Sequence, residues 1–259
     1  MDLSIVIPCF NEADNVDVLS RELGPVVEQL RQDRTVELVF VDDGSTDGTG
    51  DLLERRFIGD QCATVVRHGH NRGLGAALRT GFGQAHGDVI VSTDSDATYP
   101  FPLILKLLDL LEPGVDIVTA SCYHPQGGVD NVPGYRVFLS KSASLMYRVI
   151  LDWRIHTYTC MFRAYRRQVL EKITFESDGF LSVTELLAKA LVDGYVVREL
   201  PCTLRARRYG ASKAKVARII RSHLRFQWQL LRAYGLGALR RARVRGQVAS
   251  ERVVHPPAA

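Results

Sequence analysis

The sequence has no hydrophobic run long enough to cross a membrane. A membrane-spanning helix needs about 20 consecutive apolar residues, and no stretch of this 259-residue chain reaches that length. The chain also lacks the features of a secretory signal, because the apolar run from Ser4 to Ile7 starts almost at once, without a basic region or a small-residue cleavage site. We therefore expect a cytoplasmic protein.

Cysteine is scarce and widely spaced. The five cysteines, at positions 9, 62, 122, 160 and 202, form none of the close pairs typical of zinc knuckles or redox motifs. Their odd number argues against a disulfide framework. We interpret them as buried free thiols.

Acidic residues are absent from one long segment. From Arg205 to Arg245 the chain contains thirteen Lys or Arg and no Asp or Glu, which leaves 20 basic and 29 acidic residues on the rest. The formal net charge of +4 therefore divides into an acidic body and a basic C-terminal arm. Such an arm suits a nucleic acid or a membrane surface, and composition alone does not distinguish the two.

What the sequence does contain is a regular alternation of short β-branched runs and helical stretches. With 46% hydrophobic and 24% charged residues, the chain has the composition of a folded globular protein. The alternation predicts an α/β fold with a mostly parallel central sheet flanked by helices, whose ligands bind beyond the carboxyl ends of the strands. The expected strands are 4–7, 36–41, 63–66, 89–92 and 117–120, and the expected helices are 16–32, 48–56, 74–85 and 102–111.

The second half of the chain is less regular. A linker rich in Gly and Pro, 124–134, precedes an amphipathic helix over 135–150. Further along, the pattern predicts a strand over 159–165, a helix over 183–192 and a strand over 195–200.

Two acidic motifs follow expected strands. Asp94-Ser95-Asp96 places two carboxylates one residue apart, where they can hold a divalent cation that bridges a diphosphate. Such pairs also occur in ordinary turns and helix caps. Asp42 and Asp43 precede a tight glycine turn, where a carboxylate can accept hydrogen bonds from a base or ribose.

Four motifs in order resemble those of the family 2 glycosyltransferases, which have the GT-A fold. They are Ile5 to Glu12 (IVIPCFNE), Val41 to Thr49 (VDDGSTDGT), Asn71 to Ala77 (NRGLGAA), and Asp94-Ser95-Asp96 with Tyr99-Pro100. Two later segments, Arg207 to Lys213 and Phe162 to Arg166, resemble the R-x-x-G-x-S-K and F-R-x-Y-[RK] motifs of the polyprenyl (dolichyl) phosphate mannosyltransferases. The resemblance covers roughly residues 3–215.

The resemblance implies a role for each matching residue. The residues implied to bind the nucleotide sugar are Pro8, Phe10, Glu12, Val41, Asp43, Asp94, Ser95 and Asp96. Asp94 and Asp96 would also bind Mg²⁺ or Mn²⁺, and Arg207 and Lys213 would reach over the phosphates. The residues implied to be catalytic are Asp96, Glu185, Arg207 and Lys213. Glu185 matches an acidic position of the family and would act as a base or organise the acceptor site. The alternative is a structural role for this acid.

The implied reaction is an inverting transfer of mannose or glucose from a nucleoside diphosphate sugar, GDP-mannose or UDP-glucose, to a polyprenyl phosphate. A phosphate acceptor is already anionic, so it needs cations for positioning rather than a general base. The alternatives are a hydroxyl acceptor, with Glu185 or Asp178 as base, and a non-catalytic module that binds nucleotide sugars or nucleic acid. Two positions depart from the family: Cys122 stands where Arg is usual, and Thr157 where an acid is usual.

The basic arm contains apolar residues at helical spacing from Val216 onward, with arginines mostly on another side. We interpret it as an amphipathic helix that binds the inner face of the membrane peripherally, with no nucleic-acid partner; packing on the catalytic domain is the alternative. The expected organisation is a catalytic domain over 1–212, the basic helical arm over 213–245 and a disordered tail over 246–259.

The remaining motif residues have simple expected roles. Asn71 is expected to cap the helix that follows it, and His68, His70 and His86 are expected to be surface histidines without metal-site spacing.

Overall fold

The computed structural model describes residues 1–57, 59–207 and 216–234. Lys213, the arm residues 214, 215 and 235–245, and the predicted tail of 246–259 lie outside these residues.

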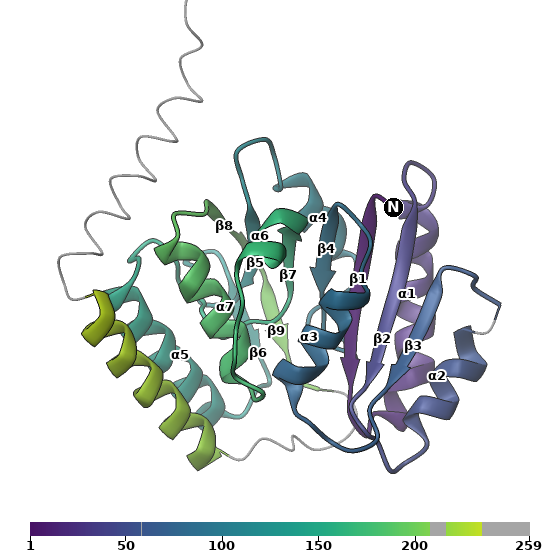
Figure 1. Cartoon of the computed structure of the whole chain (residues 1–259), viewed down its shortest axis with the longest axis horizontal. Helices are drawn as coiled ribbons and strands as arrows, with labels where there is room; N and C mark the ends of the chain where they lie inside the picture. Colours follow the sequence, from purple (N-terminus) through teal and green to yellow (C-terminus); the bar gives the residue numbers. More distant parts are fainter. Residues whose placement is uncertain (58, 208–215, 235–259) are drawn as a thin grey trace, which may run out of the picture.

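A seven-stranded sheet forms the centre of the molecule, in the order β3-β2-β1-β4-β7-β5-β8 (Figure 1). β7 runs antiparallel to both β4 and β5, and every other neighbouring pair is parallel. The prediction of a mostly parallel sheet is therefore confirmed. The strands are β1 (Leu3–Cys9), β2 (Val36–Asp42), β3 (Ala63–Arg67), β4 (Val89–Ser92), β5 (Ile117–Ser121), β7 (Arg163–Arg166) and β8 (Val197–Pro201).

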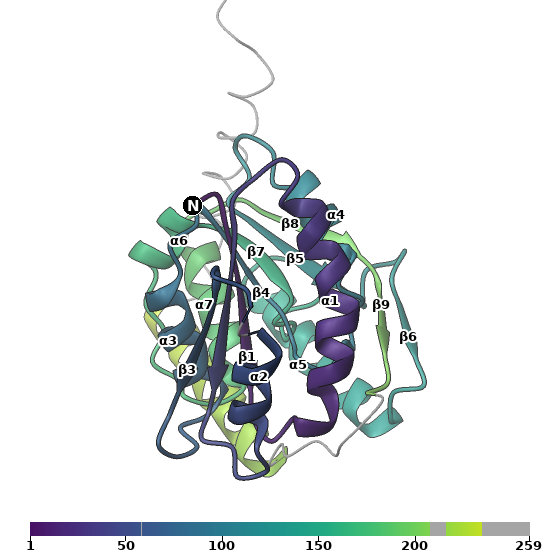
Figure 2. The same ribbon diagram turned by 90° about the vertical axis from the view of Figure 1, so that its right-hand side faces the viewer.

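Helices cover both faces of this sheet (Figure 2). Every residue of β1 and β2 is buried, which is typical of parallel strands with helices on both sides. One core joins the sheet to α1 and α4, and a second core joins it to α3, α5, α6 and α7. The helices are α1 (Val16–Leu30), α2 (Thr49–Phe57), α3 (Leu74–Gln84), α4 (Leu103–Asp109), α5 (Gly134–Ile150), α6 (Arg167–Lys172) and α7 (Leu181–Val192), with a 3-10 turn, η1 (Ala13–Asn15).

The second half departs from its predicted strands. The strand expected over 159–165 begins only at Arg163, and a small parallel sheet of β6 (Gly128–Asp130) and β9 (Thr203–Arg205) has no counterpart in the sequence pattern. Arg163 anchors β7, because its wholly buried guanidinium donates to Thr119 Oγ1 at 3.0 Å and to carbonyl oxygens of Tyr158 and Val183. One side chain thus ties β7 to β5, to the preceding loop and to α7.

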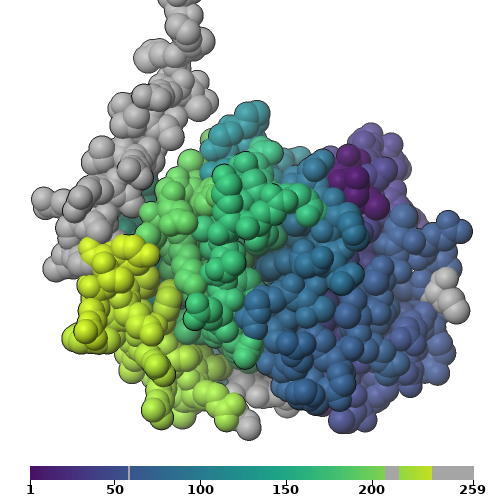
Figure 3. Space-filling view, viewed as in Figure 1, coloured from purple at the N-terminus to yellow at the C-terminus, as the bar shows by residue number. Residues whose placement is uncertain are grey.

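The C-terminal helix of residues 216–234 lies beside α5 on one flank of the molecule, at the yellow end of the colour scale in Figure 3. His223 Nδ1 lies 3.1 Å from the hydroxyl of Tyr147 on α5, and Phe226 and Leu230 complete the contact as buried residues. The outer faces of both helices remain apolar and exposed, with Phe138 at 70% and Trp228 at 65% exposure. Among the described residues, no helix has both the length and the apolar character needed to span a bilayer.

The thiols are mostly where the sequence predicts them. Cys9, Cys122, Cys160 and Cys202 are free and buried, but Cys62 is exposed because it follows the turn that precedes the edge strand β3.

Candidate active site

The carboxyl ends of β1, β2 and β4 bring the predicted nucleotide-binding residues to one edge of the sheet. Pro8 and Val41 are register partners, and the backbone N–H of Asp43 donates to the carbonyl of Cys9 at 2.8 Å. On the other side of β1, the N–H of Thr93 donates to the carbonyl of Val6, which places Asp94 next to this edge. Residues more than 80 positions apart in sequence therefore share one end of the fold.

Arg207 joins two of the predicted acids. Its Nε lies 2.6 Å from Oδ2 of Asp96, and its Nη1 lies 3.0 Å from Oε1 of Glu12. Both acids are almost fully buried. The backbone N–H of Thr98 donates to the other oxygen of Asp96 at 3.1 Å, which fixes the carboxylate after the end of β4.

The charges in this cluster act strongly on one another. Burial, and then the neighbouring charge of Asp96, raises the pKa of Asp94 to about 7, while Arg207 opposes the rise. Burial disfavours the charge of Arg207, but Asp96, Glu12 and Asp94 outweigh it and raise the pKa of Arg207. Three acids facing one guanidinium make a site that a further cation stabilises.

A cavity of about 560 Å³ opens from Asp94, Asp96 and Arg207. Arg136 and Arg205 also line it, and neither was identified from the sequence because only the folded chain brings them beside the acid pair. A second cavity of about 390 Å³ lies between α5 and the C-terminal helix and has a largely apolar lining. The two cavities are adjacent, because four residues line both of them: Arg136, Ser140, Thr159 and Phe180.

Asp43 organises the loop that leads to α3. Its two carboxylate oxygens are approached by His68 Nδ1 at 2.7 Å and by donors from Asn71 and from the backbone of Arg72 and Gly73 at 2.7 to 3.0 Å. Two expectations are therefore wrong. His68 is not a surface histidine, since its side chain is only 5% exposed. Asn71 does not cap α3, because the N-cap residue is Gly73 and no side chain bonds to the helix start there; the Asn71 amide donates to Asp43.

The turn between Asp43 and this loop requires glycine. Gly44 has φ +70°, and a β-carbon there would lie 2.2 Å from the backbone of His70. Nearby, Phe10 is half-buried beside the turn, and Ser95 is buried against the Cys9 thiol.

Glu185 lies apart from the residues that line the cavity. Its carboxylate accepts the backbone N–H groups of Glu176 and Ser177 at 3.0 and 2.9 Å and pairs with Lys189 at 2.7 Å. Asp178, the other candidate base, pairs with Arg79. Both acids thus hold the loop before α7.

The two positions that depart from the family pattern form one wall of the cavity. Thr157 Oγ1 lies 2.9 Å from Ser121 Oγ and accepts the backbone N–H of Tyr123 at 3.1 Å. Cys122 is buried beside them. A neutral hydrogen-bonded wall therefore stands where the pattern has an arginine and an acid.

Comparisons with known proteins agree with this geometry. Residues 4–174 match the model of glycosyl transferase family 2. A polyprenol monophosphomannose synthase of Mycolicibacterium smegmatis is 37% identical over 216 residues, which cover 81% of this chain and 79% of that protein. A dolichol-phosphate mannosyltransferase of Pyrococcus furiosus is 32% identical over 237 residues, which cover 91% of this chain and 65% of that protein.

The fold is also that of solved glycosyltransferases. Glucosyl-3-phosphoglycerate synthase of Mycobacterium tuberculosis superposes with a TM-score of 0.64 over 89% of this chain and 77% of that one, at 22% identity. The fold is GT-A, and the chain belongs to glycosyl transferase family 2.

Proposed function

We propose that this glycosyltransferase moves mannose or glucose from a nucleoside diphosphate sugar to a polyprenyl phosphate, with inversion at the anomeric carbon. The observation that carries the proposal is the pair of adjacent cavities, one at the acid and arginine cluster and the other, largely apolar, beside α5. It suits an acceptor with an anionic head and a long apolar chain. The names of the two relatives support the same acceptor class.

The donor binds at the strand ends. Pro8, Phe10 and Val41 supply apolar contacts for the nucleoside, and Glu12 supplies a carboxylate beside it. Asp43 acts at this site by holding the loop before α3. The carboxylate oxygens of Asp94 and Asp96 are suitable ligands for Mg²⁺ or Mn²⁺. The two negative charges repel each other, as the raised pKa of Asp94 indicates, and a bound cation relieves this repulsion. When bound, that ion neutralises the diphosphate as it leaves. The M. tuberculosis synthase, solved with Mg²⁺ and UDP, supports the same pairing.

The acceptor phosphate lies among arginines. Arg136, Arg205 and Arg207 all line the cavity, and charge-assisted bonds from such groups contribute about 1.5 to 3 kcal/mol each. Lys213 is proposed to add a further cation. A phosphate oxygen is a nucleophile without proton removal, and the engagement of Glu185 and Asp178 in loop contacts supports a reaction without a base.

The prenyl chain of the acceptor extends into the apolar cavity, whose lining includes Leu139, Met146 and Ile220. The exposed apolar faces of α5 and the C-terminal helix then lie against the membrane that holds the lipid. We propose this peripheral contact as the role of the basic arm.

The test is a transfer assay with GDP-mannose and UDP-glucose as donors, Mg²⁺ or Mn²⁺, and a short polyprenyl phosphate. We expect a glycolipid from one donor, with the anomeric configuration of the product opposite to that of the donor by NMR. The free polyprenol of the same length is the matched acceptor, and we expect no transfer to it.

Equal transfer to the alcohol and the phosphate would contradict the proposed acceptor chemistry. That result would indicate a hydroxyl acceptor, with Glu185 or Asp178 as the base.

A further inference from the structure

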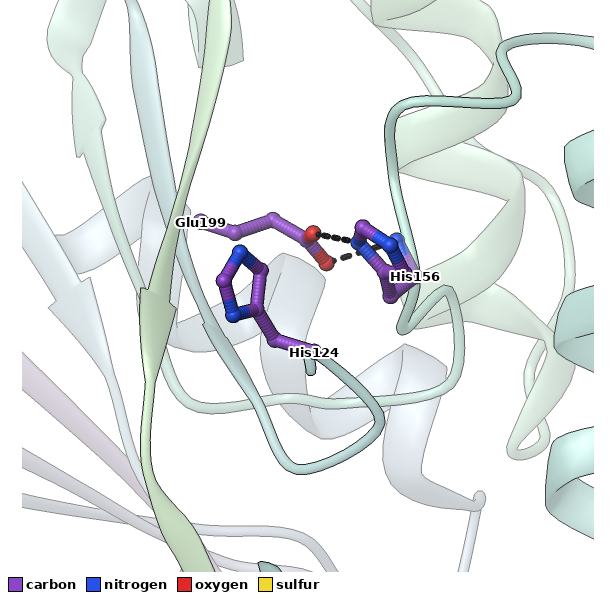
Figure 4. Close-up of side chains that lie close together, drawn as sticks. All are labelled: His124, His156 and Glu199. Atoms are coloured by element: carbon purple, nitrogen blue, oxygen red, sulfur yellow. Dashed lines mark hydrogen bonds and ion pairs between the residues drawn. The ribbon is translucent and has the colours of Figure 1, made fainter. Parts of the chain in front are cut away.

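Two histidines and one glutamate, His124, His156 and Glu199, lie close together (Figure 4). His124 follows β5 in the loop toward β6, His156 precedes β7, and Glu199 lies within β8. One ligand atom from each of the three residues lies within 4.8 Å of the others. No other group of three or more such ligands was found in the described ranges 1–57, 59–207 and 216–234.

Glu199 is held in place by the backbone. Its side chain is 6% exposed, and Oε1 accepts the N–H groups of His156 and Thr157 at 2.8 and 3.0 Å. Oε2 lies 2.6 Å from Nδ1 of His156, whose side chain is 19% exposed. The carboxylate is thus fixed in direction, as outer hydrogen bonds fix the ligands of metal sites.

The two rings are held close to this carboxylate. The centroids of His124 and His156 lie 5.0 Å apart in an edge-to-face arrangement. Figure 4 shows the rings of His124 and His156 on opposite sides of the carboxylate of Glu199.

We propose that His124, His156 and Glu199 form a binding site for one divalent transition-metal ion of the Zn²⁺ type. Two imidazoles and a carboxylate are a ligand set that Zn²⁺ takes, with a fourth position left for water. Mg²⁺ prefers oxygen ligands, so the ligand set separates this site chemically from the acid pair Asp94 and Asp96. The proposal does not rest on the proposed transfer reaction.

The ion would join three separate segments of the chain. Tyr123 and Thr157, which neighbour two of the ligands, line the cavity and share a hydrogen bond of 3.1 Å. A metal ion bound at this point holds the loop after β5 against β8. It thereby also stabilises the wall of the acceptor cavity.

Binding replaces existing contacts. The ion displaces the hydrogen bond between His156 and Glu199. The proton of the His124 ring must also move to Nδ1, which then no longer accepts the backbone N–H of Gln126, a contact of 3.2 Å. We therefore expect micromolar rather than nanomolar affinity.

The experiment measures Zn²⁺ binding to the full chain with Asp94→Asn and Asp96→Asn, which removes the acid pair as a competing site. Equilibrium dialysis with metal analysis should give one equivalent of Zn²⁺. At free Zn²⁺ about 100-fold above the dissociation constant, the melting temperature should rise by about 5 to 10 °C. Mg²⁺ at the same concentration should give neither result.

Ligand variants in the same background locate the ion. His124→Ala and Glu199→Gln should each weaken binding by about 100-fold or more. His70→Ala is the matched control, since His70 is an exposed histidine outside the cluster, and it should bind Zn²⁺ unchanged. The proposal is overturned if the background protein binds no Zn²⁺, or if His124→Ala binds Zn²⁺ as tightly as the background protein does. His124 lies in a loop, so its substitution leaves the contacts of Glu199 in β8 intact.

Discussion

Arg207 is the central side chain of the candidate active site, because it pairs with Asp96, one of the two acids proposed to bind the metal ion, and also with Glu12. It pairs with Asp96 at 2.6 Å and with Glu12 at 3.0 Å. Arg207→Ala should therefore have opposite effects on two measurements. Mn²⁺ binding without nucleotide should tighten by about tenfold, since a competing cation is lost, whereas the transfer rate should fall by about 100-fold.

Calorimetry and steady-state kinetics on the same preparation separate these effects. Arg198→Ala is the matched control, since Arg198 pairs with Glu112 at the surface. Unchanged Mn²⁺ affinity in Arg207→Ala would show that Arg207 does not compete for the acid pair.

The role of Glu185 can be decided by one conservative change. Because its carboxylate holds the backbone N–H groups of Glu176 and Ser177, Glu185→Gln should lower the free energy of unfolding by about 1 to 2 kcal/mol. The pH profile of kcat should keep its shape, as measured across the acidic and neutral range. Loss of one limb of that profile would instead identify Glu185 as a base.

Strand β7 depends on a single buried arginine. Arg163→Met would leave Thr119 Oγ1 and the carbonyls of Tyr158 and Val183 without their charged donor. We expect the free energy of unfolding, measured by urea denaturation, to fall by about 3 kcal/mol or more. Arg198→Met, which removes only an exposed ion pair, should cost less than about 1 kcal/mol.

The buried contact of the C-terminal helix with α5 should make the protein less stable in acid. Burial lowers the pKa of His223 to about 4 from its ordinary value of 6.5. The folded protein thus keeps His223 neutral while the unfolded chain takes up a proton, so stability present above pH 6.5 is lost as the pH falls toward 4. When the pH falls from 7 to 4.5, the free energy of unfolding of the wild type should decrease by about 2 kcal/mol more than that of His223→Gln.

Urea denaturation at each pH measures this difference, and His70→Gln is the exposed control. Equal losses in the wild type and in His223→Gln would contradict a neutral, buried His223.

The elements show where sequence patterns are sufficient and where they are not. The strand ends that carry Asp43 and Asp94 follow from local runs of buried residues, because parallel strands place their carboxyl ends at one edge. The pairing of β6 with β9 and the contact of Arg207 with Glu12 join segments far apart in the chain, and no local period encodes them. The spacing in α5 likewise predicts an amphipathic helix, but only packing decides that Phe138 faces outward.

The molecule as a whole has one face that combines exposed apolar residues with positive charge. This face is formed by α5 and the C-terminal helix of residues 216–234, neither of which contains an acidic residue. Arg218, Arg221 and Arg225 accompany the exposed Trp228 on the second helix. We expect the face to bind vesicles of phosphatidylcholine with anionic phosphatidylglycerol, and to bind more weakly at high salt.

The double variant Phe138→Ser and Trp228→Ser should weaken this binding by more than tenfold in a vesicle sedimentation assay, because each ring contributes about 2 kcal/mol when it enters the interface. Val129→Ser is the matched control, since Val129 is an exposed apolar residue on β6, outside this face. The double variant should also lose transfer to acceptor in vesicles while retaining transfer to a short, detergent-dispersed polyprenyl phosphate. Equal vesicle binding by the double variant and the control would mean that another surface meets the membrane, and that the lipid reaches the cavity by a route that does not pass this face.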